Sequence, residues 1–141
     1  ILLAPDVRSK YYSRSAFKSL WRQYFQYGFW KVRVFQLHPK QMSLRQFVPP
    51  AFVLAVVFSA LAALFSTVAW LIFLFILSLY AAANLLATVK AAARLELAAL
   101  PLVALSFAVL HFSYGCGFLA GLVAFRGKWR EKSSATENAV V

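Results

Sequence analysis

The feature that most limits the fold of this chain is a long stretch without any charged side chain. From Gln46 to Val89 there is no Lys, Arg, Asp, Glu or His over 44 residues. A helix that crosses the hydrocarbon core of a bilayer needs about 20 apolar residues. The stretch therefore predicts a helical hairpin that spans the membrane twice, at about residues 49–65 and 69–89, with its turn near residues 66–67.

A second uncharged run, Leu97 to Phe125, covers 29 residues and predicts a third spanning helix at residues 97–125. Pro101 falls in its first turn, where proline is tolerated. Gly117 and Gly121 have the GxxxG spacing that favours close helix packing in membranes. The whole chain is 62% hydrophobic, whereas soluble domains are about 45–50% apolar. A soluble protein of this size does not have enough interior to bury that excess.

The segment before the hairpin, residues 15–46, predicts an amphipathic helix and a linker. Ser13 or Ser15 is available as the N-cap, and His38-Pro39 ends the helix because proline disfavours helical geometry in the residue before it. Pro49-Pro50 suits the first turn of the next helix. At 100° per residue, one stripe is apolar and aromatic and the opposite side is polar. The stripe holds Phe17, Leu20, Trp21, Tyr24, Gly28, Val32 and Phe35, opposite Lys18, Arg22, Gln23, Gln26 and Arg33, whereas Phe29 and Lys31 do not fit.

Such a helix suits the membrane interface; the alternative is a helix packed on soluble protein. The chain carries 15 Lys and Arg against 4 Asp and Glu, a net charge of +11, which implies an anionic partner. Because the basic residues flank apolar spans, we expect that partner to be membrane lipid and not nucleic acid. Residues 1–46 hold nine Lys or Arg, which predicts that this N-terminal part is cytoplasmic.

The third apolar run conflicts with this orientation. A full third span would place the basic residues after it, Arg126 to Lys132, on the outside, against the positive-inside rule. Either the run spans against the rule, or it re-enters at its glycines and the tail stays inside. We favour three full spans, because the N-terminal charge bias is the stronger one. The predicted fold class is an all-α membrane protein: an amphipathic interface helix followed by about three transmembrane helices, with a short N-terminal extended segment.

Side chains that carry chemistry are scarce. The four acidic residues, Asp6, Glu96, Glu131 and Glu137, are far apart in the sequence, so none suggests a carboxylate pair for acid–base catalysis. Cys116 is interpreted as a small buried apolar residue. The amide of Asn84 is expected to bond a neighbouring helix. The chain thus predicts no catalytic residue, no metal ligand and no cofactor of its own.

Residues 1 to about 50 do resemble a known family. The motifs are Tyr12-Ser13-Arg14-Ser15 at the start of the first helix and, most specifically, Arg-Gln-Tyr-Phe-Gln-Tyr-Gly at residues 22–28. Ile1 to Asp6, His38-Pro39 and Pro49-Pro50 also fit. They resemble the region that follows the catalytic domain in bacterial membrane-bound family 2 glycosyltransferases of the succinoglycan and exopolysaccharide type. The later spans resemble that family only as apolar spans and share no motif with it. The family's acidic catalytic motifs are absent from this chain.

The resemblance implies four parts: residues 1–14 as the end of a catalytic domain of the type called GT-A, 15–46 as the interface helix and linker, 47–125 as the transmembrane region, and 126–141 as a polar tail. It implies a multi-pass protein of the bacterial inner membrane. It also implies transfer of a sugar from a nucleotide-sugar donor to a lipid-linked or polysaccharide acceptor at the cytoplasmic leaflet. A divalent metal, Mg or Mn, would be bound by the catalytic domain and not by this chain.

By the same resemblance, residues of the interface helix would contact the acceptor or lipid headgroups. Arg14, Lys18 and Arg22 would meet lipid phosphates, although plain attraction to the leaflet is the simpler explanation of these three residues. Gln23 and Trp30 would line the acceptor site. Two alternatives stay open for the chain as a whole: a small non-catalytic integral membrane subunit that packs on partner helices, and a fragment of a transporter.

Overall fold

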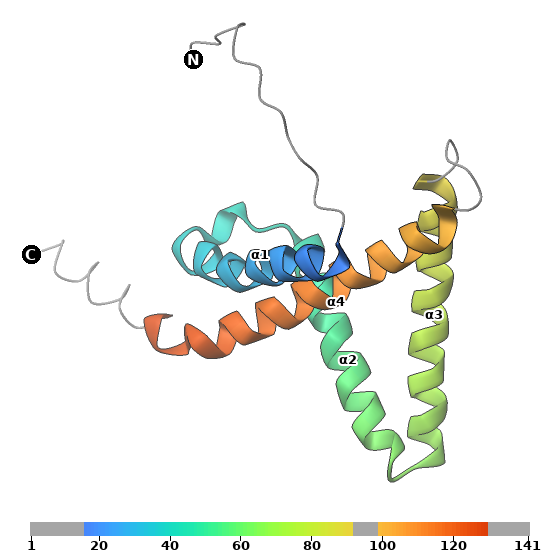
Figure 1. Ribbon diagram of the computed structural model, residues 1–141. Coiled ribbons are helices and arrows are strands. Elements are labelled where there is room, and N and C mark those ends of the chain that lie inside the picture. The colour runs from blue at the N-terminus through green and yellow to red at the C-terminus, as the bar shows by residue number, and fades with distance from the viewer. Residues whose placement is uncertain (1–15, 92–98, 130–141) are drawn as a thin grey trace, which may run out of the picture.

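The computed structural model describes residues 16–91 and 99–129, and these are almost entirely helical. The long helices are α1 (Phe17–Leu37), α2 (Val48–Ala63), α3 (Thr67–Ala91) and α4 (Leu100–Ala124), with short 3-10 helices η1 (Pro39–Gln41), η2 (Leu44–Phe47) and η4 (Arg126–Trp129) (Figure 1). The prediction of an all-helical fold with a leading helix and three apolar helices is confirmed. The expected extended segment at residues 1–14, and Ser13 and Ser15 as caps, lie outside the described residues.

Helices α2 and α3 form the predicted hairpin. Pro49 and Pro50 stand in the first turn of α2, where a proline nitrogen has no hydrogen bond to lose. The turn lies at residues 64–66, one residue earlier than expected. Near the open end of the hairpin, the rings of Phe52 and Tyr80 stack with centroids 4.4 Å apart.

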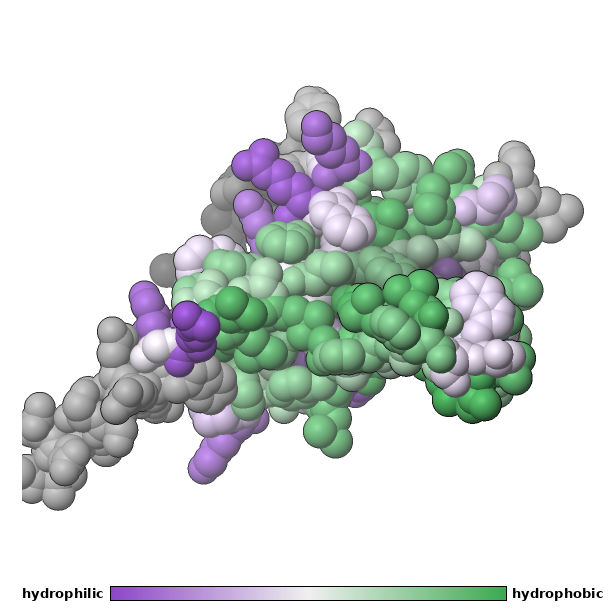
Figure 2. All heavy atoms as spheres, turned by 90° about the horizontal axis from the view of Figure 1, so that it is seen from below, coloured by the Kyte–Doolittle hydropathy of each residue, from purple (hydrophilic) through white to green (hydrophobic). Residues whose placement is uncertain are grey.

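Three helical stretches are long and apolar enough to cross a membrane: Leu44–Ala63, Thr67–Ala91 and Leu100–Ala124. Little of their surface is buried within the chain itself, and large apolar side chains such as Phe58, Phe65 and Phe75 are exposed. Figure 2, which views the molecule from the side of the hairpin turn, shows a largely apolar surface with polar groups gathered at its margins. A surface of this kind is stable only against lipid or other apolar helices. The chain is therefore a multi-pass membrane protein.

Helices α1 and α4 lie side by side and run in the same direction, across the open end of the α2–α3 hairpin (Figure 1). Their backbones touch because glycines stand at the crossing. A Cβ on Gly28 would overlap Tyr114 O, one on Gly117 would overlap Phe25 O, and one on Gly121 would lie 2.5 Å from Phe29 O. Small residues that allow such an approach are the usual basis of helix association in membranes. The glycine spacing read from the sequence therefore belongs to this contact.

The face of α1 that packs on α4 overlaps the predicted stripe only in part, since Gly28 and Val32 belong to both whereas Gln36 was not in the stripe. Gly28, Val32 and Gln36 are the buried residues of α1, and Phe29, which did not fit the stripe, lies 5.0 Å from Phe125 between ring centroids. Trp21, at the N-terminal end of the predicted stripe, is 41% exposed. The reason is that the glycines of α4 let the backbone of α1 approach closely. The contact therefore centres on the small residues of α1 and not on its aromatic side chains.

The C-terminal ends of α1 and α4 are joined. Gln36 Nε2 donates a hydrogen bond of 2.9 Å to Phe125 O, and Val32, Phe118 and Phe125 form a small buried cluster beside it. Helix α4 continues unbroken past its glycines, so the alternative in which the chain turns back at those glycines is wrong. The C-terminal ends of α1 and α4 nevertheless lie beside each other.

A polar contact joins α3 to α4. Asn84 Nδ2 donates to Ala104 O at 3.1 Å, and Thr88 Oγ1 donates to Asn84 Oδ1 at 3.3 Å. The expectation that Asn84 bonds a neighbouring helix is confirmed. Together with the α1–α4 packing, this bond ties α1, α3 and α4 to one another.

Candidate functional site

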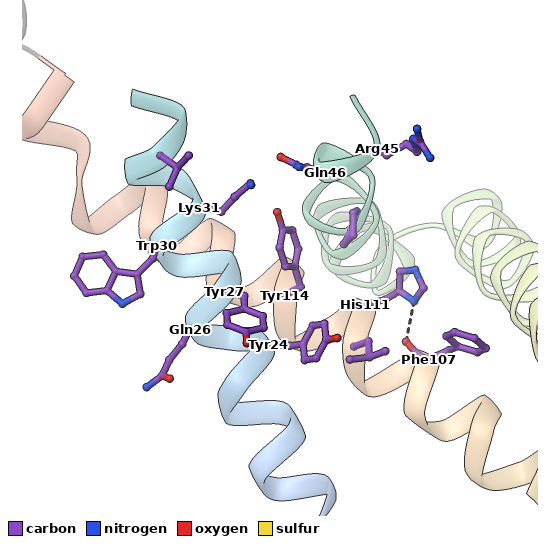
Figure 3. Close-up of a pocket in the computed structure, with 13 residues that line it drawn as sticks. Tyr24, Gln26, Tyr27, Trp30, Lys31, Arg45, Gln46, Phe107, His111 and Tyr114 are labelled. Atoms are coloured by element: carbon purple, nitrogen blue, oxygen red, sulfur yellow. Dashed lines mark hydrogen bonds between the residues drawn. The ribbon is translucent and has the colours of Figure 1, made fainter. Parts of the chain in front are cut away.

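A groove with a volume of about 790 Å³ is bounded by α1, the segment that leads into α2, and the middle of α4 (Figure 3). It lies at the open end of the hairpin, where the chain first enters its apolar stretch. It is lined by Tyr24, Gln26, Tyr27, Trp30, Lys31 and Val34 from α1, Arg45, Gln46 and Pro49 from η2 and α2, and Phe107, Leu110, His111 and Tyr114 from α4.

The local sequence explains how these residues meet. On α1, Tyr24, Tyr27, Lys31 and Val34 are three or four residues apart, which places them on one side of a helix. Because α1 ends at Leu37, the short segment that follows returns the chain beside that side of α1 before α2 begins. The groove is thus formed by a helix face, a return segment and the neighbouring span.

Two buried polar atoms in the groove have no hydrogen-bond partner among the described residues: Gln46 Oε1 and the Tyr114 hydroxyl. Figure 3 shows the ends of Lys31, Gln46 and Tyr114 directed toward the same space between α1 and α2. A buried polar atom that stays unpaired costs about 1–3 kcal/mol. The three side chains therefore present one acceptor, one hydroxyl and one ammonium group for which the described part of the chain supplies no partner.

The groove is positively charged. Lys31 points into it, and Arg45 lines it from η2 on the side of His111, with its guanidinium directed away from Lys31 (Figure 3). All four acidic residues of the chain fall outside the described ranges, so no carboxylate of residues 16–91 or 99–129 offsets these two charges. Near apolar surroundings, an unbalanced cation attracts anions more strongly than it does in water. The groove consequently suits an anionic group.

Aromatic side chains form the wall on the α1 side. Tyr24 and Tyr27 meet edge to face with centroids 5.5 Å apart, and Gln23 Nε2 donates to the Tyr27 hydroxyl at 2.8 Å. Tyrosine combines an apolar ring with a polar tip, which is why it favours boundaries between apolar and wet regions. This wall can contact both the carbon skeleton and the hydroxyls of a ligand.

An apolar slot of about 300 Å³ adjoins the groove, between α2, α3 and α4. Pro49, Phe107 and His111 line both spaces. The His111 Nδ1–H donates to Phe107 O at 2.8 Å, which holds the imidazole at the boundary. The rest of the slot is lined by Val48, Phe52, Tyr80, Ala83, Asn84 and Ala87.

The residues predicted from the sequence fall mostly outside the groove. Lys18 and Arg22 are exposed and do not line it, and Arg14 lies outside the described residues. Gln23 acts one step away, through its bond to Tyr27. Trp30 lies at the rim, where Figure 3 shows its ring on the side of α1 away from Tyr114 and Gln46.

The sequence reasoning missed the polar residues that do converge here, namely Lys31, Arg45, Gln46, His111 and Tyr114. One signal was present: Lys31 is a cation that did not fit the polar side of its helix. Its position next to the predicted apolar stripe is the one that faces the groove. Nothing comparable marks Tyr114, since one aromatic residue among many in an apolar span has no distinguishing pattern.

Among residues 16–91 and 99–129, no group of three His, Cys, Asp or Glu gathers to hold a metal ion. Cys116 is a half-buried free thiol in α4. The groove therefore offers binding and positioning chemistry, supplied by cations, amides, hydroxyls and aromatic rings. No protein-family model matches this chain, and comparison with curated proteins and with solved structures gives no significant match.

Proposed function

We propose that this chain is the membrane-anchoring C-terminal part of a family 2 glycosyltransferase, which moves a sugar from a nucleotide-sugar donor to a lipid-linked or polysaccharide acceptor at the cytoplasmic leaflet. The proposal rests on the resemblance of residues 1 to about 50. The catalytic residues and the divalent metal would belong to the catalytic domain of the longer polypeptide, so this part contributes membrane attachment and acceptor positioning.

One observation carries the proposal furthest: the helix that resembles the family's interface helix is packed backbone to backbone on α4, through Gly28, Gly117 and Gly121. A helix held this firmly fixes the height and orientation of whatever precedes it relative to the spans. An acceptor whose lipid part lies in the leaflet needs that arrangement, because its reactive end must meet a donor that arrives from the cytosol. The groove opens beside the same helix.

The test uses the full-length gene product in membrane vesicles. Radiolabelled nucleotide sugars are supplied with and without Mg²⁺ or Mn²⁺, and the label is followed into the lipid and polysaccharide fractions. We expect metal-dependent transfer into one of these fractions. Absence of transfer from every nucleotide sugar, together with an upstream reading frame that encodes no catalytic domain, would contradict the proposal.

A second candidate is a non-catalytic membrane subunit that packs on partner helices. It is favoured by the exposure of the α2–α3 hairpin, whose large apolar side chains, among them Phe58, Leu71 and Phe75, have no cover within the described residues. Crosslinking in membranes from Phe75 on α3 separates the two candidates. A single protein partner captured at Phe75 favours the subunit, whereas crosslinks to lipid alone favour the anchor.

A further inference from the structure

We infer that the groove and the adjoining apolar slot together form a binding site for one anionic membrane lipid. The headgroup, with its phosphate and hydroxyl, lies in the groove, and one hydrocarbon chain lies in the slot. The inference goes beyond the proposed function and does not depend on it, since a non-catalytic membrane subunit would carry the same site.

The groove supplies the partners that a phosphorylated headgroup needs. The Lys31 ammonium and the Tyr114 hydroxyl point into one space, and both donate hydrogen bonds to phosphate oxygens. Gln46 Oε1 is an acceptor without a partner, so a ligand must donate a hydrogen bond to satisfy it. A deprotonated phosphate has no donor, whereas a glycerol or sugar hydroxyl has one. The polar atoms thus indicate a headgroup with both a phosphate and a hydroxyl.

The slot supplies room for the chain. It lies between α2, α3 and α4 and is walled mainly by Val48, Phe52, Ala83, Ala87 and Phe107. Small residues on α3 leave its space open, and removing a hydrocarbon chain from water into such a space is favourable by about 0.8 kcal/mol per CH₂. Because Pro49, Phe107 and His111 line both cavities, a single molecule can occupy the two at once.

Charge selects among lipids. Lys31 and Arg45 flank the groove, and no carboxylate of the described residues lies near them. A zwitterionic headgroup carries its own cation, which these side chains would repel. An anionic headgroup carries none, and each basic residue near a lipid surface contributes about 1 kcal/mol to its attraction. The site therefore distinguishes phosphatidylglycerol from phosphatidylcholine.

The experiment is native mass spectrometry of the purified full chain in detergent, titrated with phosphatidylglycerol or phosphatidylcholine. Wild-type protein is expected to retain one phosphatidylglycerol about tenfold or more tightly than phosphatidylcholine. The variant Lys31→Gln with Arg45→Gln is expected to lose this preference. The matched control, Lys128→Gln with Arg126→Gln, removes the same charge from exposed positions outside the groove and is expected to keep it.

A second pair of variants tests the slot. Ala83→Leu fills it, whereas Ala82→Leu adds the same side chain to the neighbouring exposed position of α3 that does not line it. We expect Ala83→Leu to weaken retention of long-chain phosphatidylglycerol at least threefold more than Ala82→Leu does, about 0.6 kcal/mol. Circular dichroism and thermal melting confirm that each variant is folded before it is compared.

The competitor glycerol phosphate separates a lipid site from a free-phosphate site. The proposal expects it to displace phosphatidylglycerol only weakly, because it has no chain for the slot. The proposal is overturned if the control pair loses the preference as fully as the groove pair, if phosphatidylcholine is retained equally well, or if glycerol phosphate competes as strongly as the lipid. Because the two variant pairs change different elements, misfolding of one still leaves the other as a test.

Discussion

Gln36 and Phe125 are joined by a hydrogen bond of 2.9 Å from the Gln36 side chain to the Phe125 carbonyl, although they lie 89 residues apart in the sequence. The bond ties the last turn of α1 to the residue that follows α4. It adds a second hydrogen bond to a carbonyl at a helix end, which also accepts from the Lys128 backbone N–H at 3.0 Å, and it fixes the two helices in register. The interface helix is thereby part of the membrane domain's fold.

Loss of this bond is expected to loosen the α1–α4 pair. Gln36→Leu keeps the size of the side chain but removes the donor. Because Phe125 O also accepts from the Lys128 backbone N–H at 3.0 Å, we expect the variant to lose only the net contribution of one hydrogen bond, about 0.5–1.5 kcal/mol of unfolding free energy. Gln26→Leu is the control, because Gln26 is exposed on the same helix. Thermal melting in detergent measures the difference. Equal melting temperatures for the two variants would show that the bond contributes nothing.

The glycine contact between α1 and α4 predicts a larger loss of unfolding free energy. A Cβ on Gly117 overlaps backbone atoms of Phe25, and backbone cannot move aside as a flexible side chain does. Gly117→Ala should therefore lower the unfolding free energy by about 1–3 kcal/mol. Gly127→Ala serves as the matched control, because nothing lies within 4 Å of its added Cβ. If Gly117→Ala melts like the wild type, the close packing of the two helices is wrong.

The Asn84 bond to Ala104 O predicts a smaller change. Side-chain hydrogen bonds between helices in membranes contribute about 0.6 kcal/mol on average, so Asn84→Ala should destabilise the α3–α4 contact by roughly that amount. Ser78→Ala, at an exposed position of α3, is expected to change nothing. Equilibrium unfolding in mixed detergent resolves differences of this size when both variants are measured in parallel. A Ser78 variant as unstable as the Asn84 variant would assign the effect to the helix and not to the bond.

The sequence predicted the elements well and their packing less well. The hairpin follows from uncharged length alone, and the prolines at residues 39, 49, 50 and 101 mark where helices stop or start. The Asn84 contact was also predicted, because an amide in an apolar span needs a partner. These features depend only on residues close together in the chain and on the thickness of a bilayer.

The packing face of α1 was predicted only in part from α1 itself. Gly28 and Val32 belong to the predicted stripe, but contact through these small residues and not through the larger aromatic ones depends on glycines of α4, about 90 residues away. The groove depends on the same long-range choice, since Lys31 and Tyr114 come together only once the two helices are in register. Lys18 and Arg22, chosen for their charge, stand on the exposed side.

The packing of α1 on α4 predicts where the end of α4 lies in the membrane. Because α1 and α4 run parallel and Gln36 contacts Phe125, we expect the basic residues Arg126 and Lys128 to lie on the same side as Lys40 and Arg45. That orientation would satisfy the positive-inside rule. It differs from the outer tail expected from the sequence, although α4 is long and apolar enough to cross a membrane.

Side-specific labelling of single cysteines tests this central claim most directly. In a Cys116→Ser background, cysteines are placed at Lys40, Ser66 and Gly127, and a membrane-impermeant maleimide is applied to right-side-out and to inverted vesicles. All three positions are exposed. Our account predicts that the cysteines at 40 and 127 label from the cytoplasmic side and the cysteine at 66 from the opposite side. Labelling of position 127 together with position 66 would contradict it.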